Sequence, residues 1–249
     1  MSQQTIKVAA VGDLHCTKDA TGKFKDYFRQ ASAAADMLLL CGDLTDYGTA
    51  EEAEVLAEEL SVVKIPMAAV LGNHDYESGT PEEVIRVLAE AGVQVLDGDV
   101  CEIEGIGIAG AKGFAGGYGR GALGPWGEPA IKQFVDEAIH EALKLESALA
   151  KLRTPQRIAL LHYSPIEATV KGEPLEIYPF LGTSRLEDPL IHHPVDVVFH
   201  GHAHRGSLEG KTVNGITVYN VAKPLLQRSY PEQPAFRIVE FARGDAAKS

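Results

Sequence analysis

Short apolar runs alternate with longer amphipathic segments along the first third of the chain. Residues 6–11, 37–41 and 66–71 are mainly apolar or β-branched runs that predict buried strands. The segments between them predict helices at residues 24–35 and 50–60, the second rich in Ala, Glu and Leu. Strand–helix–strand units of this length leave their strands parallel in one sheet.

The rest of the chain continues the mixture of strands and helices. Two helices are predicted at residues 81–91 and 129–152, the longer one with one apolar and one solvated, charged face. Short strands and turns over residues 94–109 predict a meander on a second sheet. The remaining predicted strands lie at residues 157–161, 195–199, around 212, at 217–220 and at 236–241. The fold class is therefore α/β, and the tail, residues 242–249, is expected to be frayed.

Polar side chains occupy the ends of the first three predicted strands. Asp13, Asp43 and Asn73 follow these strands at successive intervals of 30 residues. Because the strands are parallel, their carboxyl ends meet at one edge of the sheet, and we expect the three oxygen ligands to be neighbours. A glycine precedes each ligand, and these glycines are expected to supply tight turns or close backbone approach.

Five histidines lie at the same kind of position. His15 and His74 follow the first and third strands, and His162, His202 and His204 follow two later strands. So many polar groups are not expected in a hydrophobic core, because each of them would need a hydrogen-bond partner when buried. Imidazole with carboxylate and amide oxygens, and no thiolate, suits Mn, Fe, Zn or Co. The set is large enough to predict a site for two divalent metal ions.

Composition narrows the choice of partner and compartment. The formal charge is −12 over 249 residues, without a basic cluster, which argues against a nucleic-acid polymer but leaves a small anionic substrate open. The three cysteines show no C-x-x-C and are expected to be free thiols in a reducing cytoplasm. No signal peptide and no apolar run of about 18 residues is evident, so we expect a cytoplasmic protein without a membrane partner.

A glycine-rich segment occupies residues 113–127. Residues 119–124 match G-x-G-x-x-G, but this stretch does not join a strand directly to a helix. The acidic residue expected about 20 positions later falls inside a helix, so a dinucleotide site is rejected in favour of a mobile loop. His200 is expected to be a structural residue at a strand end, with support of a metal ligand as the alternative.

The motifs together resemble a known family. D-x-H, G-D, G-N-H-D, a single H and G-H-x-H, in this order between residues 13 and 204, look like the calcineurin-like metallophosphoesterases. The resemblance implies a two-sheet α/β/β/α sandwich with the active site at the carboxyl ends of the strands. It also implies one metallophosphoesterase domain over residues 1–249, with a loop and helix inserted at 113–152 and a long connection at 172–190.

The resemblance assigns roles to the polar residues at the strand ends. Three residues would bind each metal ion, and one more would bridge the two ions. The first set is Asp13, His15 and His204, the second is Asn73, His162 and His202, and the bridging residue is Asp43. His74 would contact the phosphoryl group and protonate the leaving oxygen, and Asp75 would orient or tune His74.

The reaction that follows is in-line attack on phosphorus by a metal-bridging hydroxide, with His74 as general acid. The D-x-H opening and the compact length resemble the phosphodiesterase branch, including cyclic-nucleotide enzymes. We therefore expect a small phosphodiester substrate, with phosphomonoesters as the alternative. A DNA nuclease would need a basic groove and a non-catalytic scaffold would show eroded ligands, and the sequence has neither feature.

Two segments without a family motif, residues 113–127 and 175–185, are expected to select the substrate. Arg120, Tyr118 and Arg185 are the candidates there to contact a phosphate or to stack on a base.

Overall fold

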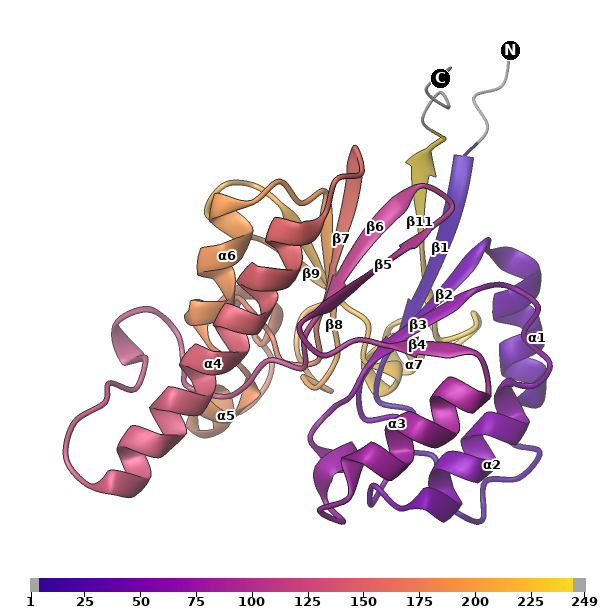
Figure 1. The fold of residues 1–249 in the computed structure, drawn as a ribbon, viewed down its shortest axis with the longest axis horizontal. Coiled ribbons are helices and arrows are strands. Elements are labelled where there is room, and N and C mark those ends of the chain that lie inside the picture. Colours follow the sequence, from indigo (N-terminus) through magenta and orange to yellow (C-terminus); the bar gives the residue numbers. More distant parts are fainter. Residues whose placement is uncertain (1–4, 244–249) are drawn as a thin grey trace.

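The strands form two sheets that pack face to face in the computed structural model, which describes residues 5–243 (Figure 1). The first sheet has the order β11-β1-β2-β3-β4 and the second has the order β5-β6-β7-β8-β10-β9. The first comprises β1 (Thr5–Val11), β2 (Met37–Cys41), β3 (Met67–Val70), β4 (Val93–Val95) and β11 (Arg237–Ala242). The second comprises β5 (Asp99–Ile103), β6 (Ile106–Gly110), β7 (Gln156–Leu160), β8 (Val197–His200), β9 (Glu209–Lys211) and β10 (Thr217–Asn220).

Helical crossovers make the centre of each sheet parallel. β1, β2, β3 and β4 pair in parallel, and so do β6, β7, β8 and β10. The crossovers of the first sheet are α1 (Lys25–Ala34), α2 (Ala50–Leu60) and α3 (Pro81–Glu90). α2 begins with a capping box in which Thr49 and Glu52 satisfy each other's backbone amides. The predicted parallel strands and their order of crossovers are confirmed.

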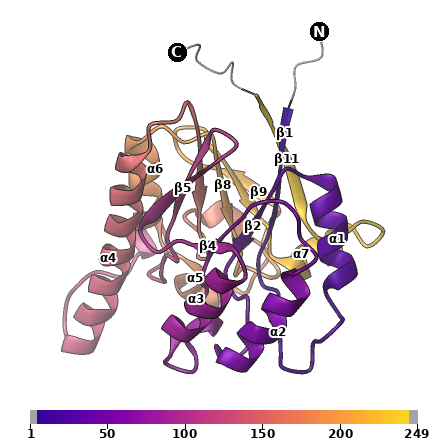
Figure 2. The same cartoon turned by 45° about the vertical axis from the view of Figure 1, so that its right-hand side comes forward.

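Helices cover the outer faces of the two sheets and complete a four-layer sandwich. Figure 2 shows α1, α2 and α3 on one side, with α4 (Pro129–Lys151) and α6 (Glu187–His192) on the other. Successive residues of β2 alternate between the two interfaces: Leu39 packs among buried side chains between the sheets, and Leu38 and Leu40 pack toward the helices. The predicted α/β sandwich is confirmed.

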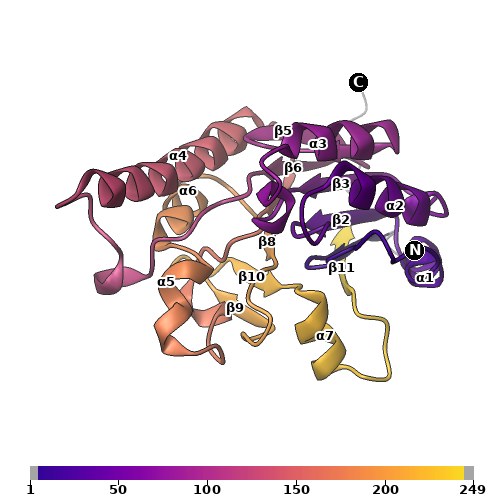
Figure 3. The same cartoon turned by 90° about the horizontal axis from the view of Figure 1, so that it is seen from below.

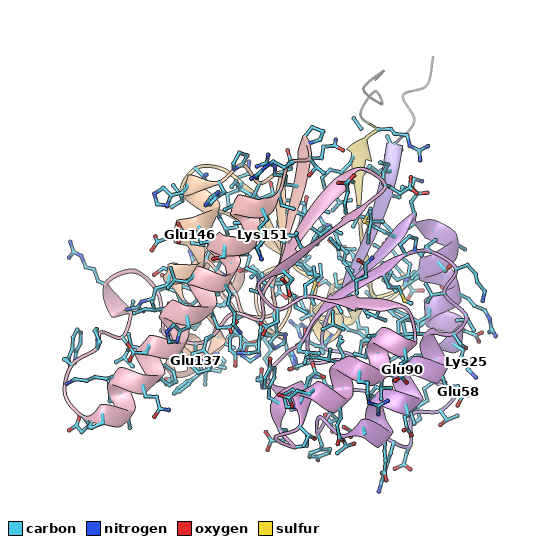
Figure 4. All side chains as sticks on the ribbon, viewed as in Figure 1. Lys25, Glu58, Glu90, Glu137, Glu146 and Lys151 are labelled. Carbon is cyan, nitrogen blue, oxygen red and sulfur yellow. The ribbon has the colours of Figure 1, made fainter. Side chains whose placement is uncertain are left out.

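Charged side chains lie on the outside of the helices. Figure 4 shows Lys25 of α1 beside Glu58 of α2, and the two form an ion pair at 2.8 Å. Glu137 and Glu146 are exposed on α4, in keeping with a solvated face. Glu141 differs, because its carboxylate is buried and accepts hydrogen bonds from the Gly113 amide and from Lys144.

Several elements differ from the sequence-based prediction. The meander at 94–109 is divided between the sheets, because β4 pairs with β3 while β5 and β6 form an antiparallel hairpin in the second sheet. The long connection contains α5 (Tyr178–Leu181) and α6, and a further helix, α7 (Lys223–Ser229), was not predicted. These helices have four to seven residues, too few to show a helical apolar period.

The prediction of a frayed tail at residues 242–249 can be compared with the structure only in part. Residues 244–249 of the tail lie outside the described part, whereas Ala242 ends β11 and pairs with Thr5. Among residues 5–243, none of the helices combines the length and the apolar character that crossing a bilayer requires.

Candidate metal centre

The polar strand ends of both sheets meet at one edge of the sandwich, onto which Figure 3 looks. Turns after β1 and β2 are joined by backbone hydrogen bonds, from the Asp13 amide to Gly42 and from the His15 amide to Asp43, at 2.9 and 3.0 Å. The second sheet is tied to this edge because the His202 amide donates to both carboxylate oxygens of Asp13, at 2.9 and 3.0 Å. Residues 189 positions apart in the chain thereby become neighbours.

The backbone is strained at this edge. Among the described residues, five other than glycine have positive φ, and Asp13, His15, Asp43 and His202 are four of them, with φ between 46° and 68°. Such conformations cost of the order of 1–3 kcal/mol each and persist where the surroundings impose them. Four of the seven expected metal ligands therefore carry backbone strain.

The glycines beside the ligands are required by close packing. A β-carbon on Gly72 would lie 2.1 Å from Asp43 Oδ1, and one on Gly42 would lie 2.5 Å from His162 Nδ1. Gly42 also has φ of +79°. The expected close backbone approach is confirmed at both positions.

The first group of potential ligands consists of Asp13, His15 and His204. One ligand atom from each lies within 4.8 Å of the others. His204 Nε2 is 3.0 Å from Asp13 Oδ1, and the rings of His15 and His204 are 5.4 Å apart.

The second group consists of Asp43, His162 and His202, with Asn73 beside it. Asp43, His162 and His202 also have ligand atoms within 4.8 Å of one another. His162 Nε2 is 3.0 Å from Asn73 Oδ1 and 3.3 Å from Asp43 Oδ1. The other carboxylate oxygen of Asp43 is 3.9 Å from His15 Nε2, so this carboxylate faces both groups.

Outer contacts set the tautomers of the ligand imidazoles. His162 Nδ1 is 2.9 Å from the Cys41 carbonyl and His202 Nε2 is 3.1 Å from the Phe180 carbonyl. A carbonyl can only accept, so each of these nitrogens carries the proton and the other ring nitrogen keeps its lone pair. Burial lowers the pKa of both imidazoles to about 4, which leaves the rings neutral at pH 7.

The donor set fits a cation. His162 Nε2, Asn73 Oδ1 and Asp43 Oδ1 are three lone-pair atoms that converge without a proton to share. His15 Nδ1 contacts the Asp46 carboxylate at 3.1 Å, while its Nε2 is buried without a hydrogen-bond partner. Facing lone pairs and an orphaned buried nitrogen are unfavourable unless a positive ion lies between them.

His74 is oriented by a residue that the sequence analysis did not select. Its Nδ1 is 2.7 Å from the Asp46 carbonyl, and the Asp46 carboxylate contacts His15. Asp46 thus holds two site imidazoles, one through its backbone and one through its side chain. The only signal for this role was its place three residues after Asp43.

Asp75, which was expected to orient or tune His74, makes its hydrogen bonds to other residues. Asp75 is fully buried, and its carboxylate accepts from the backbone amides of Leu44, Thr45 and Gly72 and from the Thr45 hydroxyl. It therefore joins the turn after β3 to the turn after β2. It reaches His74 only through its charge, which with those of Asp43 and Asp46 raises the pKa of the imidazole.

The pKa of His74 is the balance of opposing effects. Burial of the ring lowers it, whereas the hydrogen bond to the Asp46 carbonyl and the nearby carboxylates raise it, and the net shift is upward. The side chain is 40% exposed, so a substrate can reach the ring.

The two segments without family motif pack against each other. The amides of Gly116 and Gly117 donate to the carbonyls of Pro179 and Gly182, at 2.7 and 2.9 Å. Arg185 Nη2 donates to the Leu123 carbonyl at 2.8 Å. The segment 113–127 is therefore tied to the segment 175–185 by hydrogen bonds at Gly116, Gly117 and Leu123.

The three candidate substrate residues have different environments. Tyr118 is buried and its hydroxyl donates to the Ser164 carbonyl, so it has a structural role and is withdrawn as a substrate contact. Arg185 bonds the glycine-rich segment, and its Nη1 is buried without a partner. Arg120 is exposed on a 3-10 turn (Gly119–Gly121).

His200 is structural, as expected. Its ring is fully buried between the Thr169 hydroxyl and the Gly201 carbonyl, at 2.8 and 2.7 Å. Burial lowers the pKa of His200 to about 4.

Known proteins share this sequence pattern and fold. The family model of calcineurin-like phosphoesterases matches residues 6–206. A probable cyclic nucleotide phosphodiesterase of Synechococcus sp. is 24% identical over 248 residues, which cover 93% of this chain and 85% of that protein.

Solved structures agree with the fold at low sequence identity. Phosphopantetheinyl hydrolase from Mycobacterium tuberculosis is 14% identical with a TM-score of 0.66, covering 94% of this chain and 95% of that one. A purple acid phosphatase from yellow lupin (Lupinus luteus) seeds is 14% identical with a TM-score of 0.54, covering 90% of this chain and 44% of that one. These likenesses establish a shared architecture.

Proposed function

The chain belongs to the calcineurin-like phosphoesterase family, and from this premise we propose that it hydrolyses a small phosphodiester with two divalent metal ions at the strand ends. Family membership implies a metal-dependent phosphoric ester hydrolase. The finer proposal concerns the number of ions, the residues that hold them, the class of ester and the role of His74.

The convergence of three unprotonated ligand atoms, His162 Nε2, Asn73 Oδ1 and Asp43 Oδ1, carries the proposal. We assign Asp13, His15 and His204 to one ion and Asn73, His162 and His202 to the other, with Asp43 between them. Two groups of ligand atoms within 4.8 Å of one another, with a carboxylate facing both, support this assignment. The ligand types suit Mn, Fe, Zn or Co.

Bound there, divalent ions supply charge for the phosphoryl oxygens and lower the pKa of water, so that hydroxide is available near neutral pH. The chain's own contribution begins with orientation. Asp46, Cys41 and Phe180 fix the ligand rings through their outer nitrogens, which limits rearrangement when the substrate arrives.

His74 acts in this proposal as the general acid. The Asp46 carbonyl requires a proton on His74 Nδ1, so the proton available for transfer is the one on Nε2. A raised pKa keeps a larger share of the imidazole protonated near neutral pH, and its partial exposure gives access to a leaving oxygen.

Two observations support the choice of a small diester. The Synechococcus relative is named a probable cyclic nucleotide phosphodiesterase, and the acidic chain, at −12, lacks the basic character expected for a polymeric nucleic acid. The alternative substrates are phosphomonoesters, and the assay must distinguish hydrolysis of monoesters from hydrolysis of diesters.

The test compares hydrolysis of bis(p-nitrophenyl) phosphate and p-nitrophenyl phosphate by metal-stripped protein to which Mn²⁺ is added back. Metal-dependent turnover biased to the diester supports the proposal, and a bias to the monoester replaces it with a phosphatase. Absence of turnover of both esters, with two metals bound, contradicts it.

A variant separates metal binding from acid catalysis. His74→Ala should keep both metals, measured by elemental analysis, and lose several orders of magnitude in turnover. His140→Ala, an exposed histidine on α4, is the matched control and should match the parent protein. Loss of metal by His74→Ala would contradict the role assigned to His74.

A further inference from the structure

An apolar patch is exposed beside the metal centre. Leu175, Ile177 and Phe180 are 74%, 38% and 59% exposed, and all three lie in or just before the short helix α5. Exposed large apolar side chains gathered in one segment typically mark a binding surface. None of the three contributes to the buried clusters of the described residues.

The segment that carries the patch is firmly attached. Leu181 is buried, and its carbonyl accepts from the Ser164 amide at 3.0 Å. The Gly116 amide donates to the Pro179 carbonyl at 2.7 Å. A segment anchored on both sides of Phe180 presents its exposed side chain from a fixed position, which lowers the entropy lost on binding.

Phe180 is also the residue of this segment that contacts the metal centre. Its carbonyl oxygen lies 3.1 Å from His202 Nε2. This imidazole has a ligand atom within 4.8 Å of those of Asp43 and His162. In Phe180, the β-carbon that carries the phenyl ring is two bonds from this carbonyl carbon. A phosphoryl group held by these ligand atoms would therefore lie close to the segment that exposes the phenyl ring of Phe180. Figure 3 shows this segment, α5, at the edge of the sandwich where the strands end.

We propose that Phe180 is the platform on which the organic group of the substrate stacks, and that this group is flat and apolar, as an aromatic ring or a nucleobase is. The inference rests on the proposed phosphoester hydrolysis and specifies the class of ester. A phenyl ring has no hydrogen-bonding group, so it selects for a π-face or apolar shape and tolerates different ring substituents. Leu175 and Ile177 extend the apolar surface around it.

The experiment compares two inhibitors with the same phosphate and different organic groups, adenosine 5′-monophosphate and ribose 5-phosphate. Inhibition constants are measured against bis(p-nitrophenyl) phosphate with the Mn²⁺-loaded protein. Stacking on an aromatic side chain gives the base an advantage of at least about fivefold in the parent protein. Phe180→Ala should bring the ratio close to one and leave the constant for ribose 5-phosphate within about twofold, while Phe180→Trp should restore the preference.

Two controls distinguish stacking from a structural effect. Trp126→Ala removes a side chain that is 67% exposed just before α4 and should leave the ratio unchanged. Metal content is measured for each variant, because the Phe180 backbone supports His202. The proposal is overturned if the parent protein shows no preference, or if Phe180→Ala keeps it.

Failure of the proposed function is separable from failure of this inference. If the parent protein hydrolyses neither nitrophenyl ester, the same two ligands are titrated by calorimetry into Mn²⁺-loaded protein. A preference that depends on Phe180 then supports the platform without hydrolysis, and equal affinities overturn it.

Discussion

Replacement of Asp75 by Asn tests how the site is attached to the fold. The buried carboxylate accepts from four donors: the amides of Leu44, Thr45 and Gly72 and the Thr45 hydroxyl, at 2.6 to 3.2 Å. Because the three amides can only donate, the contacts favour an ionised carboxylate. Burial and the nearby charge of Asp43 raise its pKa and oppose ionisation.

The cost of Asp75→Asn follows from these bonds. An amide keeps one oxygen, so the best orientation leaves the NH₂ group facing a buried amide donor such as Gly72 N–H. Hydrogen bonds to a charged group are worth about 1.5–3 kcal/mol, and an unsatisfied buried donor costs about 1–3 kcal/mol. With weaker bonds to the remaining donors, we expect the free energy of unfolding to fall by about 3–5 kcal/mol. That is a large fraction of the stability of a typical domain.

Urea unfolding followed by circular dichroism in EDTA measures this change without the contribution of bound metal. Asp196→Asn is the control, since its exposed carboxylate accepts one backbone bond, from the Arg157 amide at 2.7 Å, and its replacement should cost below about 1 kcal/mol. A loss below about 1 kcal/mol for Asp75→Asn would refute the reasoning. It would mean that the carboxyl is protonated in the native protein, where an amide replaces it at little cost.

Two further predictions address metal binding and pH. Asp46→Ala removes the side chain that holds His15 and keeps the carbonyl that holds His74, so Mn²⁺ affinity, measured by calorimetric titration, should fall by about 10- to 100-fold. Unchanged affinity would contradict the orienting role. For His200, the folded-state pKa of about 4 lies below the unfolded value near 6.5. The unfolded state therefore binds more protons as the pH falls below 6.5, and the free energy of unfolding decreases between pH 6.5 and 4. We expect the free energy of unfolding, measured with urea in EDTA, to fall between pH 7.5 and 5.5 by about 1.3 kcal/mol more in the parent protein than in His200→Gln. Equal decreases in the two proteins would contradict this role of His200.

The sequence was informative where the signal is local or periodic. The runs that form β1, β2 and β3 have continuous apolar character, and the helices between them have enough residues to show their type. The regular spacing of Asp13, Asp43 and Asn73 then follows from repeated strand–helix–strand units, whose parallel strands end at one edge. The short helices α5 and α7 and the assignment of β4 to the first sheet depend on contacts distant in the chain, which have no local signature.

The sequence by itself determined the sandwich, the edge that carries the polar residues and the types of ligand available. Only the tertiary structure decided which atoms face each other, because side-chain orientation is set by partners far away in sequence. It placed Asp46 rather than Asp75 against the His74 ring, buried Tyr118, and brought the Phe180 carbonyl to His202. The tertiary structure also imposed positive φ on four ligand residues. Such strained conformations persist only where the surrounding packing supports them, so the sequence pattern does not predict them.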